Sequence, residues 1–302
     1  MTDFGTANGG VLSVEARARL ASTHDDDPVP DILDQSAAGR QAVASWRAEQ
    51  HRSWGEDTAV GETDHRPVSI AGVPCLVAGR DDAAITVVYL HGGGYCLGSP
   101  GTSIPITARL VRSGDPARRV ISVGYRLAPE HPFPAGLDDA VAVYGHAVSG
   151  ATPGPVALAG DSAGAGLALA VALQAARTGV ALPIGVMLLC PHLDHRRLPT
   201  NAGLATMLAA YVGAADPADA LVSPAAATDP ELPALPPILL QTTTTEALFP
   251  NAVAFAQRLD RLGVAVTSQI WDGLWHTWHY HRELPEAWDA VDRCRRWLAD
   301  LL

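Results

Sequence analysis

The stretch that most constrains the fold of this chain runs from residue 155 to residue 166. Its apolar residues 156–159 lead into Gly160-Asp161-Ser162-Ala163-Gly164, and an alanine- and leucine-rich stretch follows. This order predicts a strand, a sharp turn and a helix, with Ser162 at the turn. The flanking glycines remove side chains that would collide with neighbouring backbone, and a helix N-terminus favours negative charge at the serine. A chain with 28 glycines can produce this spacing by chance, but the strand before it and the helix after it favour a nucleophilic serine.

Apolar segments of strand length alternate with longer helical segments along most of the chain. The near-continuous apolar run 85–90 is typical of a strand in a parallel sheet that is covered on both faces. We expect further strands at 120–123, 156–159, 184–189, 238–242 and 264–271, helices at 133–148, 163–178, 251–262 and 285–301, and a hairpin at 67–79. This alternation predicts an α/β fold with a mostly parallel central sheet flanked by helices.

The N-terminal part of the chain differs from the rest. Residues 1–65 are polar, and the segments 11–21 and 32–50 have helix-like composition. We interpret 1–65 as an N-terminal cap with weak helices, and a solvated extension is the alternative. Residues 198–220 are also expected to be helical, and they lie between core elements, so they are a second candidate for the cap. The main domain is expected at 66–302.

Composition excludes several classes of function. The formal net charge of −11 argues against nucleic acid as a main partner, because phosphate binding needs a basic face. The four cysteines are widely spaced without a C-x-x-C pair, so they indicate neither a zinc site nor a disulfide framework. No run reaches the roughly 18 apolar residues of a membrane span, and the start lacks a basic region followed by an apolar core. We therefore expect a cytoplasmic protein.

A glycine-rich loop follows the expected strand 85–90. It reads His91-Gly-Gly93-Gly94-Tyr, and its three glycines let the backbone approach a substrate closely. The N–H groups of Gly93 and Gly94, together with that of Ala163 after the serine, would form an oxyanion hole. A simple glycine turn or a phosphate loop is the alternative. The absence of G-x-G-x-x-G and of a following lysine disfavours nucleotide binding.

Three motifs in chain order resemble one family. Residues 91–95 (HGGGY), 125–134 (YRLAPEHPFP) and 160–164 (GDSAG) are similar to those of the hormone-sensitive-lipase-like esterases. The resemblance runs from about residue 66 to the C-terminus. It implies an α/β-hydrolase fold with an N-terminal cap, esterase activity on small acyl esters and no metal or organic cofactor, and a homodimer through the last strand and helix is open. One departure is Gly124, where the family usually has Asp or Asn.

The general base is expected after the last strand. By its similarity to the family's histidine loop, His276 is the expected base, and His279 and His281 are its rivals. The histidine-rich run could also be a metal cluster, but it lacks an ordered set of acidic ligands and lies where a triad histidine belongs. The spacing of His192 and His195 is interpreted as loop polarity rather than as a metal site.

The orienting acid is expected after the penultimate strand. Glu246-Ala-Leu resembles the family's acidic motif, with Glu in place of the usual Asp. A carboxylate there would fix the histidine tautomer and stabilise the imidazolium. Asp272 is the alternative acid, although a turn residue before a glycine is the simpler interpretation. Asp161 beside the serine is interpreted as structural, and four threonines before Glu246 have no assigned role.

These residues predict a serine hydrolase of carboxylic esters or lactones with small to medium acyl groups. Ser162 would attack the carbonyl while His276 takes its proton and Glu246 holds His276, and water would then release the acyl group. Tyr95 and Trp275 are expected to line the substrate pocket. Acyl transfer, and elimination or cyclisation of a specialised metabolite, stay open on the same residues. A non-catalytic binding protein is the alternative from another class.

Overall fold

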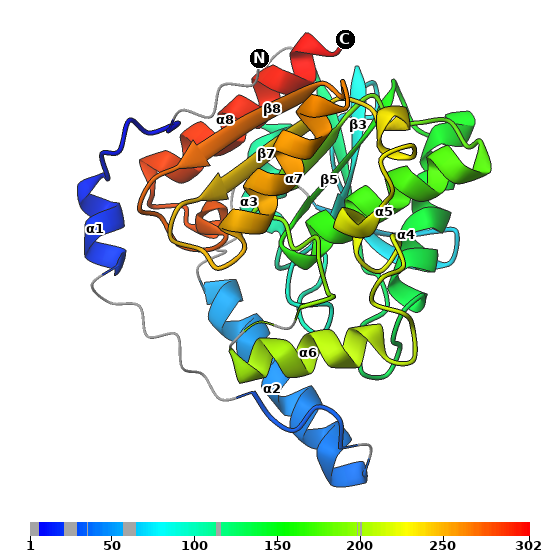
Figure 1. Ribbon diagram of the computed structural model, residues 1–302, viewed down its shortest axis with the longest axis vertical. Coiled ribbons are helices and arrows are strands. Elements are labelled where there is room, and N and C mark those ends of the chain that lie inside the picture. The colour runs from blue at the N-terminus through cyan, green and yellow to red at the C-terminus, as the bar shows by residue number, and fades with distance from the viewer. Residues whose placement is uncertain are drawn as a thin grey trace.

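The computed structural model describes residues 6–20, 29–34, 36–56, 65–112, 116–197, 199 and 201–302. A single sheet of eight strands forms its centre (Figure 1). The strands are β1 (Arg66–Ile70), β2 (Val73–Gly79), β3 (Ile85–Leu90), β4 (Arg118–Val123), β5 (Val156–Asp161), β6 (Val186–Leu189), β7 (Ile238–Thr243) and β8 (Val266–Trp271). They lie in the order β1-β2-β4-β3-β5-β6-β7-β8. The first two neighbouring pairs are antiparallel and the others are parallel.

Helices surround this sheet: some cover its two faces, and others lie beyond its ends and edges (Figure 1). They are α1 (Val14–Leu20), α2 (Ala37–Glu56), α3 (Ile104–Val111), α4 (Ala135–His146), α5 (Ala163–Thr178), α6 (Ala202–Val212), α7 (Phe249–Arg261) and α8 (Pro285–Asp300), with shorter helical turns η1 (Ala147–Ala151), η2 (Pro224–Ala226), η3 (Leu232–Ala234) and η4 (Trp278–Tyr280). Successive residues of β3 point to opposite faces. Val87 belongs to the core cluster formed with α3 and α8, whereas Val88 belongs to the cluster formed with α4, α5 and α7. Among the helices described, none combines the length and apolarity that crossing a bilayer requires.

The predicted alternation is present, together with one helix that the sequence pattern does not predict. The expected strands and core helices form with ends shifted by a few residues, and the hairpin turns at Ala71 and Gly72, which both have positive φ. The additional helix is α3, where β-branched residues and Pro105 weaken the helical pattern. Pro105 lies in the first turn, where a missing N–H breaks no hydrogen bond.

Helices α2 and α6 lie beyond the carboxyl ends of the parallel strands (Figure 1). Both contact the loop after β3. Arg47 of α2 donates to the carbonyl oxygen of Cys96 at 2.7 Å and forms a two-pronged ion pair with Glu130. Cys96 Sγ lies 3.5 Å from the carbonyl oxygen of Met207 in α6. The expected helical segments 11–21, 32–50 and 198–220 correspond to the shorter or shifted helices α1, α2 and α6. Of the expected cap segments, residues 1–5, 21–28, 35, 57–64, 198 and 200 lie outside the described residues.

Residues 6–13 run along β8 and reach the start of α8. Thr6 forms a parallel bridge with β8, and the side-chain amide of Asn8 exchanges two hydrogen bonds of 2.9 Å with the backbone of Asp272. Ser13 donates to both carboxylate oxygens of Glu286 in α8. Because β8 is the last strand of the sheet, this segment occupies its outer edge. The homodimer expected through this strand stays a prediction.

Candidate active site

Ser162 occupies the turn between β5 and α5. Its φ of 50° and ψ of −118° place it in a region that costs a non-glycine residue about 1–3 kcal/mol. A Cβ added to Gly160 would come closer than 3.0 Å to the carbonyl oxygen of Gly164, and one added to Gly164 would come as close to that of Leu90. The two flanking glycines therefore make room for the turn, as their positions in the sequence predict.

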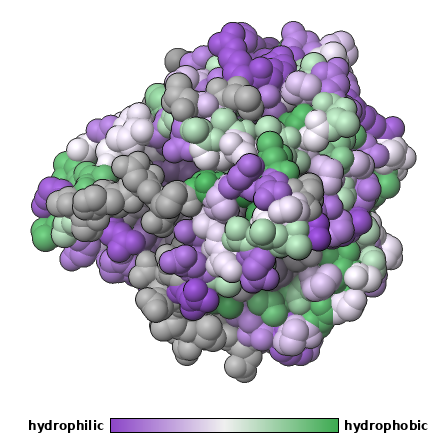
Figure 2. All heavy atoms as spheres, turned by 90° about the horizontal axis from the view of Figure 1, so that it is seen from below, coloured by the Kyte–Doolittle hydropathy of each residue, from purple (hydrophilic) through white to green (hydrophobic). Residues whose placement is uncertain are grey.

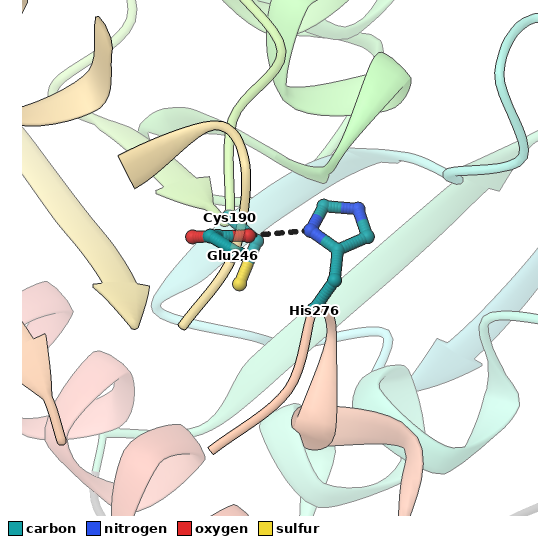
Figure 3. A group of neighbouring side chains, drawn as sticks. All are labelled: Cys190, Glu246 and His276. Atoms are coloured by element: carbon teal, nitrogen blue, oxygen red, sulfur yellow. Dashed lines mark hydrogen bonds and ion pairs between the residues drawn. The ribbon is translucent and has the colours of Figure 1, made fainter. Parts of the chain in front are cut away.

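A chain of hydrogen bonds connects Ser162, His276 and Glu246. His276 Nε2 lies 2.9 Å from Ser162 Oγ, and His276 Nδ1 lies 2.5 Å from Glu246 Oε2 (Figure 3). Ser162 comes from the start of α5, Glu246 from the loop after β7, and His276 from the loop after β8. The carboxyl ends of three parallel strands thus bring together a hydroxyl, an imidazole and a carboxylate, in the order that a catalytic triad for acyl transfer would require.

Glu246 is the most enclosed member of this chain. Its side chain is only 1% exposed, whereas that of His276 is 39% exposed. Glu246 Oε1 accepts hydrogen bonds from the hydroxyl of Thr242 at 2.5 Å and from the N–H of Thr243 at 3.2 Å. Burial raises the pKa of Glu246, but the hydrogen bonds from His276, Thr242 and Thr243 outweigh it, so the pKa lies below its usual value. Glu246 is therefore ionised at neutral pH, as an orienting acid must be.

Cys190 lies beside Glu246 and His276 (Figure 3). The potential donor atoms of these three residues lie within 4.8 Å of one another, and no other group in the described ranges offers three such metal ligands. Burial raises the pKa of the Cys190 thiol well above its usual value, so the thiol is protonated. The 2.5 Å contact between His276 and Glu246 is a hydrogen bond with no space for an ion, and the arrangement is that of an acid–base pair.

The glycine-rich loop after β3 has the backbone shape needed for an oxyanion hole. Gly93 and Gly94 have φ values of 116° and 57°, which favour glycine. Among the described residues, neither of their N–H groups has a hydrogen-bond acceptor. Tyr125 supports the loop by donating to the carbonyl oxygen of His91 at 2.6 Å and by stacking on its ring. Ala163 is the first residue of α5, so its N–H has no acceptor within the helix.

The run of threonines, which has no assigned role in the sequence, ties the acid loop to the histidine loop. The hydroxyl of Thr243 donates to the carbonyl oxygen of Leu274 at 2.7 Å, and that of Thr245 donates to the same oxygen. The hydroxyl of Thr244 donates to Asp272 at 2.6 Å. Asp272 is thus a turn residue bonded to the threonine run, and the structure places Glu246, rather than Asp272, at His276.

The rival histidines have other partners. His279 is fully buried, and its Nε2 lies 2.8 Å from the side-chain oxygen of Gln241. His281 Nδ1 lies 3.3 Å from Glu283, near the surface. The three histidines of the run therefore have different partners, so they do not converge on one point as the ligands of a single metal ion would.

His192 and His195 lie in a loop, as expected, but they do not face solvent as polar loop residues usually do. Both side chains are buried, and Nδ1 of His192 lies 3.2 Å from Nε2 of His195. Burial lowers their pKa values to about 4 and about 3, so both are neutral at pH 7. The N–H of His192 also donates to the carbonyl oxygen of Ser162 at 3.0 Å. A spacing of three residues in a polar loop carries no signal of this burial.

The two residues predicted to line the pocket differ in their surroundings. Tyr95 is buried with a positive φ, and its ring stacks on Tyr211 of α6 with centroids 3.6 Å apart. Trp275 is half-buried next to His276 in the chain, and its ring meets the edge of His281 with centroids 5.0 Å apart. Both therefore lie beside the loops of the site, and their contact with a substrate stays a prediction.

Comparison with known proteins identifies the family. A family model described as an alpha/beta hydrolase fold matches residues 87–280. The chain belongs to the α/β-hydrolase family. An acetyl-hydrolase of Streptomyces hygroscopicus is 40% identical over 224 residues, which are 68% of this chain and 73% of that protein. A carboxylesterase of Mycobacterium tuberculosis is 36% identical over 281 residues, which are 86% of this chain and 80% of that protein.

Solved structures of this α/β-hydrolase's relatives agree with its fold. The structure of a hormone-sensitive lipase from a metagenome library covers 95% of this chain and 96% of its own, with a TM-score of 0.80 and 28% identity. A homologue of hormone-sensitive lipase, also from a metagenome library, has a TM-score of 0.76 and 30% identity over 85% of this chain and 92% of its own. The resemblance to hormone-sensitive-lipase-like esterases that the motifs predict is confirmed.

Proposed function

We propose that this protein is a serine hydrolase that cleaves carboxylic esters or lactones of small to medium acyl groups through an acyl-enzyme. The observation that carries the proposal is the hydrogen-bonded chain from Ser162 through His276 to the buried, ionised Glu246. Relatives named acetyl-hydrolase and carboxylesterase support an ester as the substrate. No step of the proposed reaction needs a metal or an organic cofactor.

The proposed reaction has two half-reactions. Ser162 Oγ attacks the carbonyl carbon while its proton passes to His276 Nε2, and the oxyanion accepts hydrogen bonds from the N–H groups of Gly93, Gly94 and Ala163. His276 then protonates the leaving alcohol oxygen as the carbon–oxygen bond breaks, which leaves an acyl-enzyme. Water attacks this ester with His276 as base, and Ser162 leaves with the returned proton as the acid departs.

Helices α2 and α6 are proposed to cap the site. Both bond to Cys96, which is two residues after Gly94, through Arg47 and Met207. A Cβ added to Gly94 would lie 3.2 Å from the Met207 side chain, so α6 lies directly over the loop. Figure 2 looks at this face of the molecule, on which hydrophilic and hydrophobic residues are intermingled. Apolar side chains at the cap would favour the acyl chain over charged substrates.

Turnover of p-nitrophenyl acetate and butyrate tests the proposal, with Ser162→Ala as the control. The variant is expected to lose kcat by more than about 10⁴-fold while it keeps its melting temperature. A wild-type rate equal to that of Ser162→Ala on all esters tried, together with no labelling of Ser162 by a fluorophosphonate, would refute it. Product analysis in the presence of alcohols separates hydrolysis from acyl transfer, and free acid as the main product is expected.

A further inference from the structure

Asp161 holds a buried carboxylate that no step of the proposed mechanism uses. The residue is 1% exposed, and its two oxygens accept three hydrogen bonds. Oδ1 accepts from the hydroxyl of Tyr89 at 2.7 Å and from the N–H of Gly92 at 3.0 Å. Oδ2 accepts from the hydroxyl of Tyr280 at 2.9 Å. A buried carboxylate is tolerated only when it is well bonded, and these donors meet that condition.

The three donors come from different parts of the site. Tyr89 lies in β3, Gly92 lies in the oxyanion loop, and Tyr280 lies in η4, four residues after His276. Asp161 is the last residue of β5 and directly precedes Ser162. One carboxylate therefore joins the three segments that carry the proposed nucleophile, oxyanion donors and base.

The fit around this carboxylate is tight. A Cβ added to Gly92 would collide with the Asp161 side chain, so the loop can approach the carboxylate only with glycine at this position. Burial raises the pKa of Asp161, while the hydrogen bonds from Tyr89, Tyr280 and Gly92 favour its charged form. The carboxylate engages the N–H of Gly92, and among the described residues it accepts no hydrogen bond from the N–H groups of Gly93 and Gly94.

We propose that Asp161 is a positioning residue that fixes the oxyanion loop and the His276 loop relative to Ser162. The proposal rests on the proposed function, because its effect is expressed through ester turnover. The bonds of Asp161 to Gly92 and Tyr280 set the positions of the oxyanion donors and of the imidazole. A displacement of either by about 1 Å would lower kcat far more than it would weaken substrate binding. Asp161 does not itself touch the reacting atoms.

Tyr280→Phe is the most informative variant, because it removes one bond to Asp161 and little else. Arg109 also holds this turn, by donating to the carbonyl oxygens of His279 and His281 at 2.9 and 3.1 Å, so the variant is expected to fold. We expect kcat for p-nitrophenyl acetate to fall about tenfold or more with KM within about twofold. The matched control is Tyr144→Phe, which removes a buried hydroxyl that donates to Ala181 at 2.6 Å, far from the site. It is expected to lower the melting temperature and to leave kcat unchanged.

Two substitutions of Asp161 separate positioning from charge. Asp161→Ala leaves Gly92 and both tyrosines without an acceptor, and a loss in kcat of about 10²–10³-fold is expected. Asp161→Asn can keep its oxygen toward Gly92 and turn its NH2 toward the Tyr280 oxygen, so it is expected to recover kcat to within about tenfold of the wild type. An asparagine variant as impaired as the alanine variant would overturn a positioning role.

The outcomes distinguish this proposal from the proposed function. If the wild type turns over esters and folded Tyr280→Phe keeps its kcat, the role of Asp161 is refuted while the hydrolase function stands. If Asp161→Ala does not fold, Tyr280→Phe alone decides. If the wild type turns over no ester, the hydrolase proposal fails, and the rate at which a fluorophosphonate labels Ser162 replaces kcat. An equal labelling rate in the wild type and Tyr280→Phe would then refute the role of Asp161.

Discussion

Replacing Glu246 by glutamine tests the proposed acid through the tautomer of the histidine. Glu246 Oε1 accepts from the hydroxyl of Thr242 and from the N–H of Thr243. The N–H of Thr243 can only donate, so the amide oxygen of the glutamine must take this position. Its NH2 group then faces Nδ1 of His276, which has to become an acceptor and leaves the ring proton on Nε2. In that tautomer the histidine cannot take the proton of Ser162.

The expected cost is large for kcat and small for stability. Loss of the correct tautomer is expected to reduce kcat by about 10³–10⁴-fold, which corresponds to about 4–5.5 kcal/mol of transition-state stabilisation. Glutamine has the size of Glu246 and keeps both bonds to Oε1, so the melting temperature is expected to change little. Hydrogen bonds keep the pKa of Glu246 below its usual value against the effect of burial. Glu246 is therefore ionised throughout the neutral range, and the difference in kcat between the wild type and Glu246→Gln should not depend on the pH there.

The assay is steady-state hydrolysis of p-nitrophenyl acetate with the wild type, Glu246→Gln and one matched control. The control is Glu283→Gln, because Glu283 pairs with His281 at 3.3 Å and its side chain is 47% exposed. It removes a carboxylate from a histidine in the same loop and is expected to leave kcat unchanged. A folded Glu246→Gln variant with kcat within tenfold of the wild type would refute the tautomer argument and Glu246 as the acid.

Two further predictions concern stability. Gly164→Ala places a Cβ against two backbone carbonyls and is expected to destabilise the fold by about 3 kcal/mol or more, whereas Gly145→Ala, with nothing within 4 Å, is expected to be neutral or stabilising. Urea unfolding measures both, and equal effects would contradict the steric argument. Hydrogen bonds from Thr228 and Arg177 lower the pKa of Glu231 from 4.5 to about 2. The ionised Glu231 therefore stabilises the folded protein fully above pH 4.5, and this contribution is lost as the pH falls through about 2. The difference in melting temperature between the wild type and Glu231→Gln should disappear over that range. A gap independent of pH would contradict this assignment.

Local rules explain the part of the site that the sequence predicts. The positions of Ser162 and of the flanking glycines follow from a steric requirement within a few residues, and the loop at Gly93 follows in the same way. His276 and Glu246 are predicted only through family resemblance, because their approach to Ser162 depends on three strands meeting at one edge of the sheet. The geometry agrees with these predictions, and the catalytic roles await the variants above.

The features that the sequence does not predict depend on contacts between distant segments. His192 and His195 have the polarity of surface residues, and only the packing of neighbouring elements buries them. Gly124 departs from the family's usual Asp or Asn, and the fold gives the reason. Its N–H donates to the carbonyl oxygen of Pro74 at 2.8 Å, and a Cβ would lie 2.7 Å from that oxygen. Such close approaches become visible only when both segments are in place.

The segment 6–13 on the outer edge of β8 also has a consequence for the order in which the protein matures. Asn8 and Asp272 are separated by 264 residues along the chain. At a translation rate of about 5–20 residues per second, β8 is synthesised about 13–50 s after the segment 6–13. The segment is therefore translated early and docked late, and the last edge of the sheet closes only when synthesis has passed β8. A ribosome that stalls before this point would release a chain in which residues 6–13 have nothing to bind.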